Sequence, residues 1–131
     1  YIRIPKDLIR ISDYAFYDCK NLKEIVIPNH GSALPHSVTS IGNYTFYHCE
    51  SLKKIVIPNN VTSIGYGVFS SCYNLKEIII PNSINIIKKH AFLHCVNLKE
   101  VIIPNHGSAI SNGVKNIEEY AFPPYTNIIY E

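Results

Sequence analysis

Two short segments of this sequence hold a histidine and a serine at a spacing that could serve hydrolysis. His30 and Ser32 lie in the hexapeptide PNHGSA, and His106 and Ser108 lie in a second, identical copy of it. A serine nucleophile needs a base within hydrogen-bond reach, a third group that orients this base, and an oxyanion site. Neither hexapeptide contains a carboxylate, and GSA does not match the nucleophile-elbow motif. We therefore predict no catalytic residue and expect that the protein is not an enzyme.

The cysteines are the second set of side chains with the chemistry for a site. No two of Cys19, Cys49, Cys72 and Cys95 form a C-x-x-C pair, so the sequence predicts neither a zinc site nor another cofactor. Their regular spacing instead places them at one position of a repeat. We expect free, buried thiols that pack as small hydrophobic side chains. Disulfides between stacked neighbours are the alternative, since such neighbours approach bonding distance.

The whole chain repeats with a period of about 23 residues, which is typical of repeat architectures. VTSIGNYTFYHCESLKKIVIPNN (38–60) is followed directly by VTSIGYGVFSSCYNLKEIIIPNS (61–83), and the same pattern continues on both sides. Two units carry seven extra residues, at 30–36 and 106–112, so duplication explains the second PNHGSA. The sequence therefore predicts a single array over residues 1–131, with about five units.

Each unit reads as strand, turn, short strand and helical turn. In LKEIVI (22–27), Ile25 and Ile27 alternate with Glu24 and Val26, which is the period of a strand with one buried face. A proline follows the strand in every unit and ends it. VTSIG predicts a second, shorter strand, and the three-residue spacing of Phe and Cys predicts one helical turn. A unit of this size cannot bury its apolar side chains alone, so we expect successive units to stack into a solenoid.

The repeat resembles the BspA-like leucine-rich repeat, a family known from bacterial surface antigens and from some parasitic protists. The shared pattern is L-x-x-I-x-I-P-x-x-V-x-x-I-G-x-x-x-F-x-x-C-x-x-L, with AFYDC at 15–19 and AFLHC at 91–95. The sequence departs from it at Thr45 and Val68, which replace Ala, and at Lys88, which replaces Gly. The resemblance implies a mainly β, curved, right-handed solenoid with a parallel sheet on its concave face and short strands and helical turns on its convex side.

The same resemblance implies a non-catalytic module that binds a protein or a glycan, such as a host or extracellular-matrix protein, at the cell surface or after secretion. The formal net charge is only +2, and the basic residues are scattered, so we do not expect nucleic acid to bind. The longest apolar runs are far too short for a membrane span, and the first residues do not form a signal peptide.

The two ends of the sequence differ from the interior units. The sequence begins inside a strand pattern, so we expect a piece of a longer protein. Residues 123–131 are predicted to form a cap, because Pro123-Pro124 should disrupt the turn and Tyr125 takes the place of a cysteine.

The predicted binding surface is the outward side of the concave sheet. Matching residues of adjacent strands should form two ladders there: one with Glu24, Lys54, Glu77 and Glu100, the other with Val26, Val56, Ile79 and Ile102. The second ladder is an apolar strip bordered by charge, as in many binding sites. The alternative explanation is strand propensity, which favours Val and Ile wherever they point.

The two insertions are predicted to be binding loops at the edge of this surface, with His30, Ser32, His36, His106 and Ser108 as candidate contacts. Tolerated surface insertions without a role are the alternative. The function predicted from the sequence is therefore recognition or adhesion, and the competing function is a structural spacer that presents another domain.

Overall fold

The computed structural model describes residues 1–28, 38–104 and 116–131, and both insertions lie outside these ranges. Eleven short strands are described: β1 (Ile2–Arg3), β2 (Arg10–Ile11), β3 (Ile25–Val26), β4 (Ser40–Ile41), β5 (Lys54–Val56), β6 (Ser63–Ile64), β7 (Glu77–Ile79), β8 (Ile86–Ile87), β9 (Glu100–Ile103), β10 (Asn116–Ile117) and β11 (Asn127–Tyr130). All their pairings are parallel. No helix long and apolar enough to cross a bilayer occurs in the described ranges.

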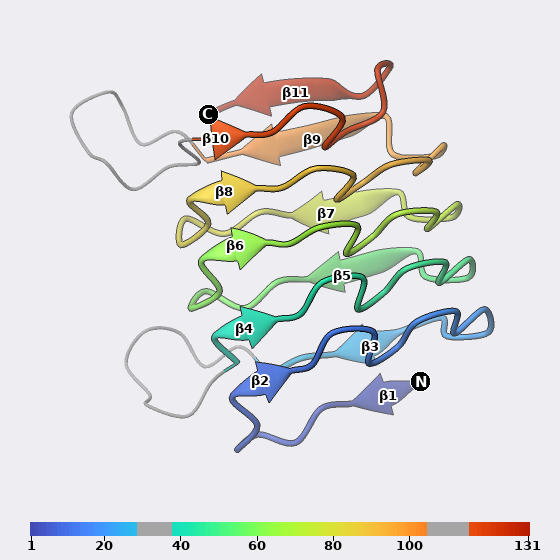
Figure 1. The fold of residues 1–131 in the computed structure, drawn as a ribbon, viewed down its shortest axis with the longest axis vertical. Helices are drawn as coiled ribbons and strands as arrows, with labels where there is room; N and C mark the ends of the chain where they lie inside the picture. Colours follow the sequence, from blue (N-terminus) through green and yellow to red (C-terminus); the bar gives the residue numbers. More distant parts are fainter. Residues whose placement is uncertain (29–37, 105–115) are drawn as a thin grey trace.

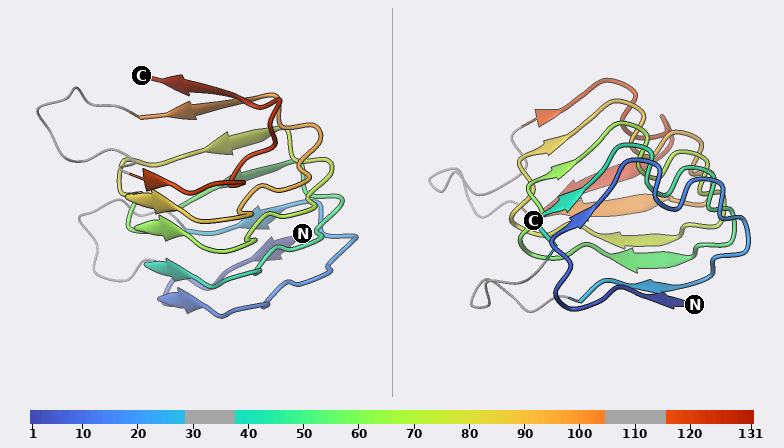
Figure 2. Two further views of the ribbon diagram at one scale, coloured as in Figure 1. Left: turned by 45° about the horizontal axis from the view of Figure 1, so that its top comes forward. Right: turned by 60° about the horizontal axis from the view of Figure 1, so that its bottom comes forward.

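The strands form two layers, which face each other along the molecule (Figures 1 and 2). The odd-numbered strands build one layer, in the order β11-β9-β7-β5 and β1-β3, and the even-numbered strands build the other, in the order β10-β8-β6 and β2-β4. Strand partners in uninterrupted units are equivalent residues of successive repeats, for example Ile55 with Ile78. The predicted parallel β-solenoid, with one turn for each sequence repeat, is therefore confirmed.

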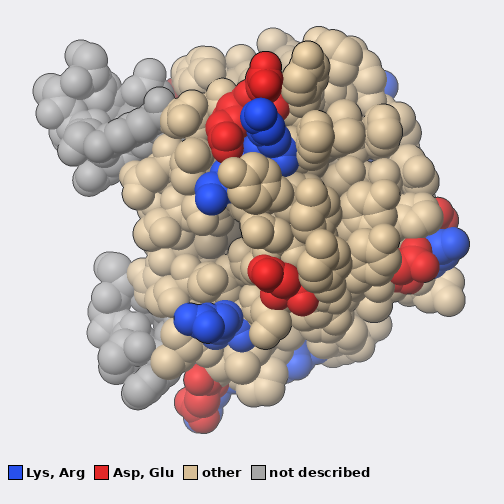
Figure 3. All heavy atoms as spheres, in the orientation of Figure 1, with Lys and Arg blue, Asp and Glu red and all other residues tan. Residues whose placement is uncertain are grey.

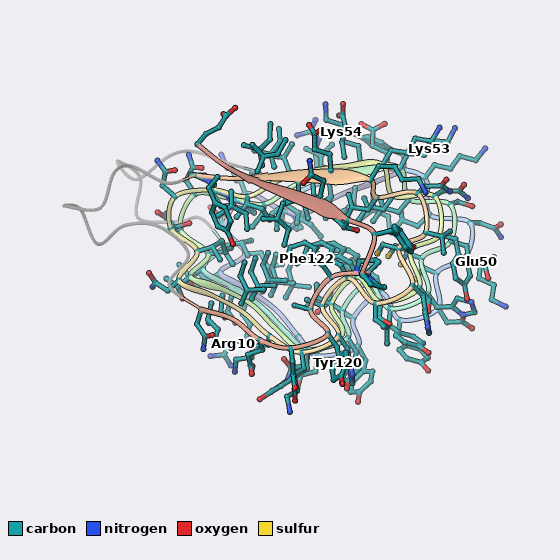
Figure 4. The ribbon with its side chains drawn as sticks, turned by 90° about the horizontal axis from the view of Figure 1, so that it is seen from above. Arg10, Glu50, Lys53, Lys54, Tyr120 and Phe122 are labelled. Carbon is teal, nitrogen blue, oxygen red and sulfur yellow. The ribbon has the colours of Figure 1, made fainter. Side chains whose placement is uncertain are left out.

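The space between the layers is filled by equivalent residues stacked along the array. Phe46, Phe69 and Phe92 are fully buried, and their neighbouring ring centroids lie 5.5 and 5.3 Å apart with nearly parallel planes. Phe16 and Phe122 extend this stack by one ring at each end, and Phe122 lies in the middle of the cross-section in Figure 4. Each unit buries its aromatic ring against the rings of its neighbours, so a single unit has no core of its own and the core forms when units stack.

The prediction of a helical turn between the short and the long strand is wrong. Overlapping β-turns occupy this segment. Tyr17 N–H donates to Tyr14 O at 3.1 Å in the middle turn, and the turns on either side of it are closed by Ala15 N–H donating to Ser12 O and by Cys19 N–H donating to Phe16 O, both at 3.2 Å. The third residues of the two outer turns, Tyr14 and Asp18, both have φ of 60°, in the left-handed region. The equivalent positions in other units also have positive φ; they are Tyr44, Gly67, His90 and Tyr120 in the first turn and His48, Ser71 and His94 in the second.

Hydrogen bonds between units hold this unfavourable backbone conformation in place. Tyr44 N–H donates to Tyr66 O at 2.8 Å, and His48 N–H donates to Ser70 O at 2.9 Å. A left-handed conformation costs a non-glycine residue about 1–2 kcal/mol. The stack meets this cost because an aligned turn satisfies backbone groups that would otherwise be buried without partners.

The replacement of glycine by Lys88 has a structural reason. In the preceding unit, a Cβ atom at Gly65 would collide with Asn43 Oδ1, which accepts a hydrogen bond from Tyr66 N at 3.1 Å. One unit further, Tyr66 takes the place of Asn43 and provides no such acceptor. A side chain is therefore tolerated at Lys88, and its Nζ lies 4.9 Å from the centroid of the Tyr66 ring.

The segment 123–131, predicted as a cap, extends the sheet. Its strand β11 pairs with β9 over four residues, from Asn127 opposite Glu100 to Tyr130 opposite Ile103. The turn before β11 accommodates the proline pair, because Thr126 N–H donates to Pro123 O at 3.1 Å. The parallel register of the long-strand sheet thus continues through Tyr130.

Candidate binding surface

The outward side chains of β3, β5, β7, β9 and β11 share one side of the solenoid, which we call the long-strand face. Strand register brings the predicted ladder residues together: Lys54 lies opposite Glu77, Val56 opposite Ile79, and Ile79 opposite Ile102. At the first strands, Arg3 lies opposite Val26. Whether this face binds a ligand is not decided by register alone, so the role of these residues stays a prediction.

The charged ladder is exposed and partly self-neutralising. Lys54 Nζ lies 3.1 Å from Glu77 Oε2, and both side chains are more than half exposed. Glu24 and Glu100 are also exposed on either side of this pair, and Lys54 projects outward from the sheet in Figure 4. An exposed ion pair contributes only about 0.2–1 kcal/mol to stability, so the fold does not depend on this ladder.

The apolar ladder is exposed to solvent over most of its length. The exposed fractions are 39% for Val56, 53% for Ile79 and 43% for Ile102, whereas Val26 is half-buried. The ladder continues at half-buried Ile129, opposite Ile102 in β11. Sequence reasoning missed Ile129 because it treated 123–131 as a cap, although NIIY contains β-branched and aromatic residues that favour a strand.

Two grooves run over the long-strand face. One, of about 500 Å³, lies over β3 and β5 and is lined by residues 23–27 and 53–56. The other, of about 550 Å³, lies over β5, β7 and β9, with Ile79 and Ile102 in its floor and Lys76, Glu77 and Glu100 at its walls. The long-strand face thus combines apolar contact area with charged groups that can orient a ligand. Figure 3 looks onto the opposite, short-strand side, where basic (blue) and acidic (red) side chains form small separate patches.

The five candidate residues of the insertions, His30, Ser32, His36, His106 and Ser108, lie outside the described residues. The described chain reaches them from β3 and from β9, which are separated by three strand-to-strand steps through β5 and β7. Their role as binding loops remains a prediction.

The cysteine column has a packing role. The buried thiols of Cys49, Cys72 and Cys95 donate to the carbonyl oxygens of Phe16, Phe46 and Phe69 at 3.2, 3.1 and 3.0 Å, so each links two units. All four cysteines are free, and Cys19 is half-buried. Burial raises the pKa of Cys49 and of Cys95 to about 12, and it raises the pKa of Cys72 well above 9.0. Such thiols are poor nucleophiles near neutral pH, because the reactive species is the thiolate.

Outside the long-strand face, a histidine lies between two carboxylates. His48 Nδ1 lies 2.8 Å from Asp18 Oδ1, and His48 Nε2 lies 2.7 Å from Glu50 Oε1. The Tyr73 ring meets the imidazole edge-on, with centroids 5.8 Å apart. Both ring nitrogens are engaged, so the cluster links two units and offers no open base. In the described part of the chain, no group of three or more His, Cys, Asp or Glu could hold a metal ion.

Comparison with known proteins identifies the repeat. The sequence profile of the BspA type leucine rich repeat region matches residues 1–122 in six copies. This chain belongs to the BspA-type leucine-rich repeat family. The matched residues include strands β1 to β10.

Two crystal structures show the same architecture. A leucine-rich repeat protein from Bacteroides ovatus is 29% identical with a TM-score of 0.76, over 94% of this chain and 28% of that protein. A leucine rich cell surface protein from Faecalibacterium prausnitzii is 32% identical with a TM-score of 0.75, over 98% of this chain and 31% of that protein. The chain therefore spans less than a third of either relative.

A leucine-rich repeat protein from T. pallidum is similar in fold alone, at 20% identity and a TM-score of 0.51, over 93% of this chain and 77% of that protein. No curated protein matches the sequence.

Proposed function

We propose that this BspA-type repeat array is a non-catalytic module that binds a protein or a glycan through its long-strand face. The observation that carries the proposal is the exposed apolar ladder of Val56, Ile79 and Ile102. A contiguous apolar strip on a protein surface is characteristic of interaction sites, whereas scattered exposed apolar residues are ordinary.

The neighbouring residues of the same strands argue for binding over strand propensity as the reason for this ladder. The neighbouring outward column of the same strands holds Lys54, Glu77 and Glu100. These strands therefore form with charged outward residues, and nothing in their backbone requires Val or Ile at the next outward position. Large apolar side chains kept at these exposed positions favour a role in contact with a partner.

We also propose that the array acts at the cell surface or after secretion, in adhesion or in recognition of a host or extracellular-matrix component. The Faecalibacterium prausnitzii relative is described as a cell surface protein, and its 32% identity over 98% of this chain supports a similar location. The insertions at 30–36 and 106–112 would extend recognition beyond the sheet.

A structural spacer is the competing function, and the stacked phenylalanines from Phe16 to Phe122 fit it equally well. A spacer needs only stacking between units and tolerates polar changes on the long-strand face.

Binding assays with matched variants separate the two functions. The array would be tested on intact cells and on a panel of extracellular-matrix proteins and glycans, beside a Val56→Asp, Ile79→Asp variant. The control is Ile9→Asp, Val96→Asp, which also replaces two exposed apolar side chains but leaves the long-strand face intact. We expect the wild type and the control to bind and the long-strand variant to lose at least tenfold in affinity. Equal binding by all three would move the site to the insertions, and no binding by any would favour the spacer.

A further inference from the structure

Backbone hydrogen bonds between successive short strands follow one rule. A residue at or just before the start of a strand and the residue after the strand both donate to carbonyls of the preceding unit. Thus Thr39 N–H donates to Ile9 O at 2.9 Å, and Gly42 N–H donates to Ile11 O at 2.8 Å. The same two bonds recur between β8 and β6, with donors Asn85 and Lys88 at 2.8 and 2.9 Å. Between β10 and β8, the donors are Asn116, the first residue of β10, and Glu118, at 3.2 and 2.9 Å.

The contact between β4 and β6 departs from this rule. Its equivalent donors are the N–H groups of Thr62 and Gly65, and its equivalent acceptors are the carbonyls of Thr39 and Ile41. The described structure contains neither bond, and β4 and β6 do not pair, although they are neighbours in contact. The short-strand layer is therefore interrupted at this contact.

The long-strand layer is interrupted at the matching place. Between β1 and β3, Ile2 N–H donates to Glu24 O at 3.1 Å and Ile4 N–H donates to Val26 O at 2.9 Å, so the carbonyls of Glu24 and Val26 point toward β1. The equivalent residues of β5 therefore direct their backbone groups toward β3. No hydrogen bond between β3 and β5 is present among the described residues, and the groove of about 500 Å³ lies over this contact.

We call the contact of β3 and β4 with β5 and β6 the seam. On the opposite side of the solenoid, the turn at 42–49 is bonded to both of its neighbours. Tyr14 N–H donates to Asn43 O at 3.0 Å on one side of it, and Phe46 N–H donates to Val68 O at 2.9 Å on the other. The Phe16 and Phe46 rings also stack, with centroids 5.6 Å apart. Among the residues that the structure describes, the seam thus lacks backbone hydrogen bonds in both sheets and has them at the turns.

We propose that the seam is a hinge, at which the block β1–β4 opens away from the block β5–β11 about the turn at 42–49. Apolar contacts are non-directional and tolerate tilting, whereas a backbone ladder fixes the distance and angle between strands. All other contacts between described strands of neighbouring units are paired, in both layers, so bending concentrates where both ladders are missing. Such a junction opens more readily than the rest of the array. Opening would widen the groove over β3 and β5 and change the spacing between Val26 and Val56.

The proposal makes a prediction about hydrogen exchange that does not depend on any ligand. The test is a disulfide across one sheet, read out in the other sheet. Val26→Cys with Val56→Cys would lock the seam in the long-strand layer. Val56→Cys with Ile79→Cys would cross the paired contact of β5 with β7 as the control. Both pairs are made in a Cys19→Ser background, which removes the half-buried thiol.

Amide exchange of Thr62 and Gly65, which lie in the short-strand layer, is measured by NMR with each lock reduced and oxidised. We expect these amides to exchange at least tenfold faster than those of Asn85 and Lys88 in the reduced protein. Formation of the Val26→Cys, Val56→Cys disulfide should slow the exchange of the Thr62 and Gly65 amides at least tenfold, because a hinge that is closed in one sheet is closed in the other. The control disulfide, between β5 and β7, should leave their exchange unchanged. Equal exchange in the reduced protein, or no slowing by the seam lock, would overturn the hinge.

Discussion

The turn side and the long-strand face are both built from repeated columns of residues, but the columns repeat for different reasons. On the turn side, each column has a packing partner one unit away, such as Cys72 Sγ on Phe46 O or the Phe69 ring on the Phe92 ring. On the long-strand face, Ile79 and Ile102 lie side by side with about half of their surface in solvent. The difference teaches that repetition alone does not separate residues that build the solenoid from residues available for binding.

The comparison also separates two kinds of experiment. Substitutions on the turn side should cost free energy of unfolding, and those on the long-strand face should cost binding with little loss of stability. The units of a repeat array are coupled to their neighbours, so one substitution affects the unfolding of the whole array. The free energies of unfolding should therefore be compared between variants of this same chain.

The largest effect should come from ionising the buried thiols. Burial raises the pKa of Cys49 and Cys95 to about 12, above the ordinary 9.0 that applies in the unfolded chain. Both states keep the thiols protonated below pH 9, so the stabilisation is fully present there. Above it the unfolded state releases protons first, and stability falls until the pH passes the folded pKa, by about 1.4 kcal/mol per pH unit for each thiol. Urea unfolding between pH 8 and 11 measures this slope. It should become shallower in Cys95→Ala, and an unchanged slope would contradict the account.

Shortening the phenylalanine stack should have the next largest effect. Phe69→Ala removes a fully buried ring that stacks on both Phe46 and Phe92, and we expect a loss of about 3–5 kcal/mol in the free energy of unfolding. Val96→Ala, at an exposed position outside the stack, is the control and should change stability by less than about 0.5 kcal/mol. A comparable loss in the free energy of unfolding in both variants would show that the phenylalanine stack contributes no more to stability than an exposed position.

Gly67 allows a sharper test of the turn side. Its φ is +57°, and a Cβ atom there would collide with Cδ1 and Cε1 of the Tyr44 ring. Gly67→Ala should therefore cost about 1–2 kcal/mol from the left-handed backbone alone, plus the cost of displacing the ring. A double-mutant cycle with Tyr44→Ala isolates the second contribution, since removal of the ring relieves the collision. Additive effects in the cycle would show that the ring does not lie over Gly67.

The smallest effect on stability should come from the charged ladder. Lys54→Ala breaks the exposed ion pair with Glu77, and we expect a change of no more than about 1 kcal/mol that decreases further as salt is added. Thermal unfolding at low and high ionic strength measures it. A loss of several kcal/mol would mean that the long-strand face is part of the stabilising framework.

The solenoid could be predicted from the sequence because the sequence period reflects one geometric requirement, the pairing of equivalent residues in successive units. Strand partners one repeat apart, such as Ile55 and Ile78, must face the same neighbours, so burial, alternation and the proline that follows each long strand from β1 to β9 agree. The ladders of the candidate site follow from the same register, and Lys54 does lie opposite Glu77.

The turn conformation was not predictable from residue type. Left-handed backbone is usually marked by Gly or Asn, but Tyr44 and His48 adopt it here because bonds to the next unit hold them. Sequence periodicity likewise cannot reveal the seam, since the residues of β3 and β5 follow the same pattern as those of paired strands. What differs there is the backbone pairing, which no residue type encodes.

The measurement that tests the central claim most directly is a pair of titrations on one ligand, chosen as the strongest binder in the panel. Dissociation constants of the wild type and of the Val56→Asp, Ile79→Asp variant are compared alongside their urea unfolding curves. The account predicts an affinity at least tenfold weaker with a free energy of unfolding unchanged within about 1 kcal/mol, because these side chains are exposed. Unchanged affinity in a stable variant would contradict the assignment of binding to the long-strand face.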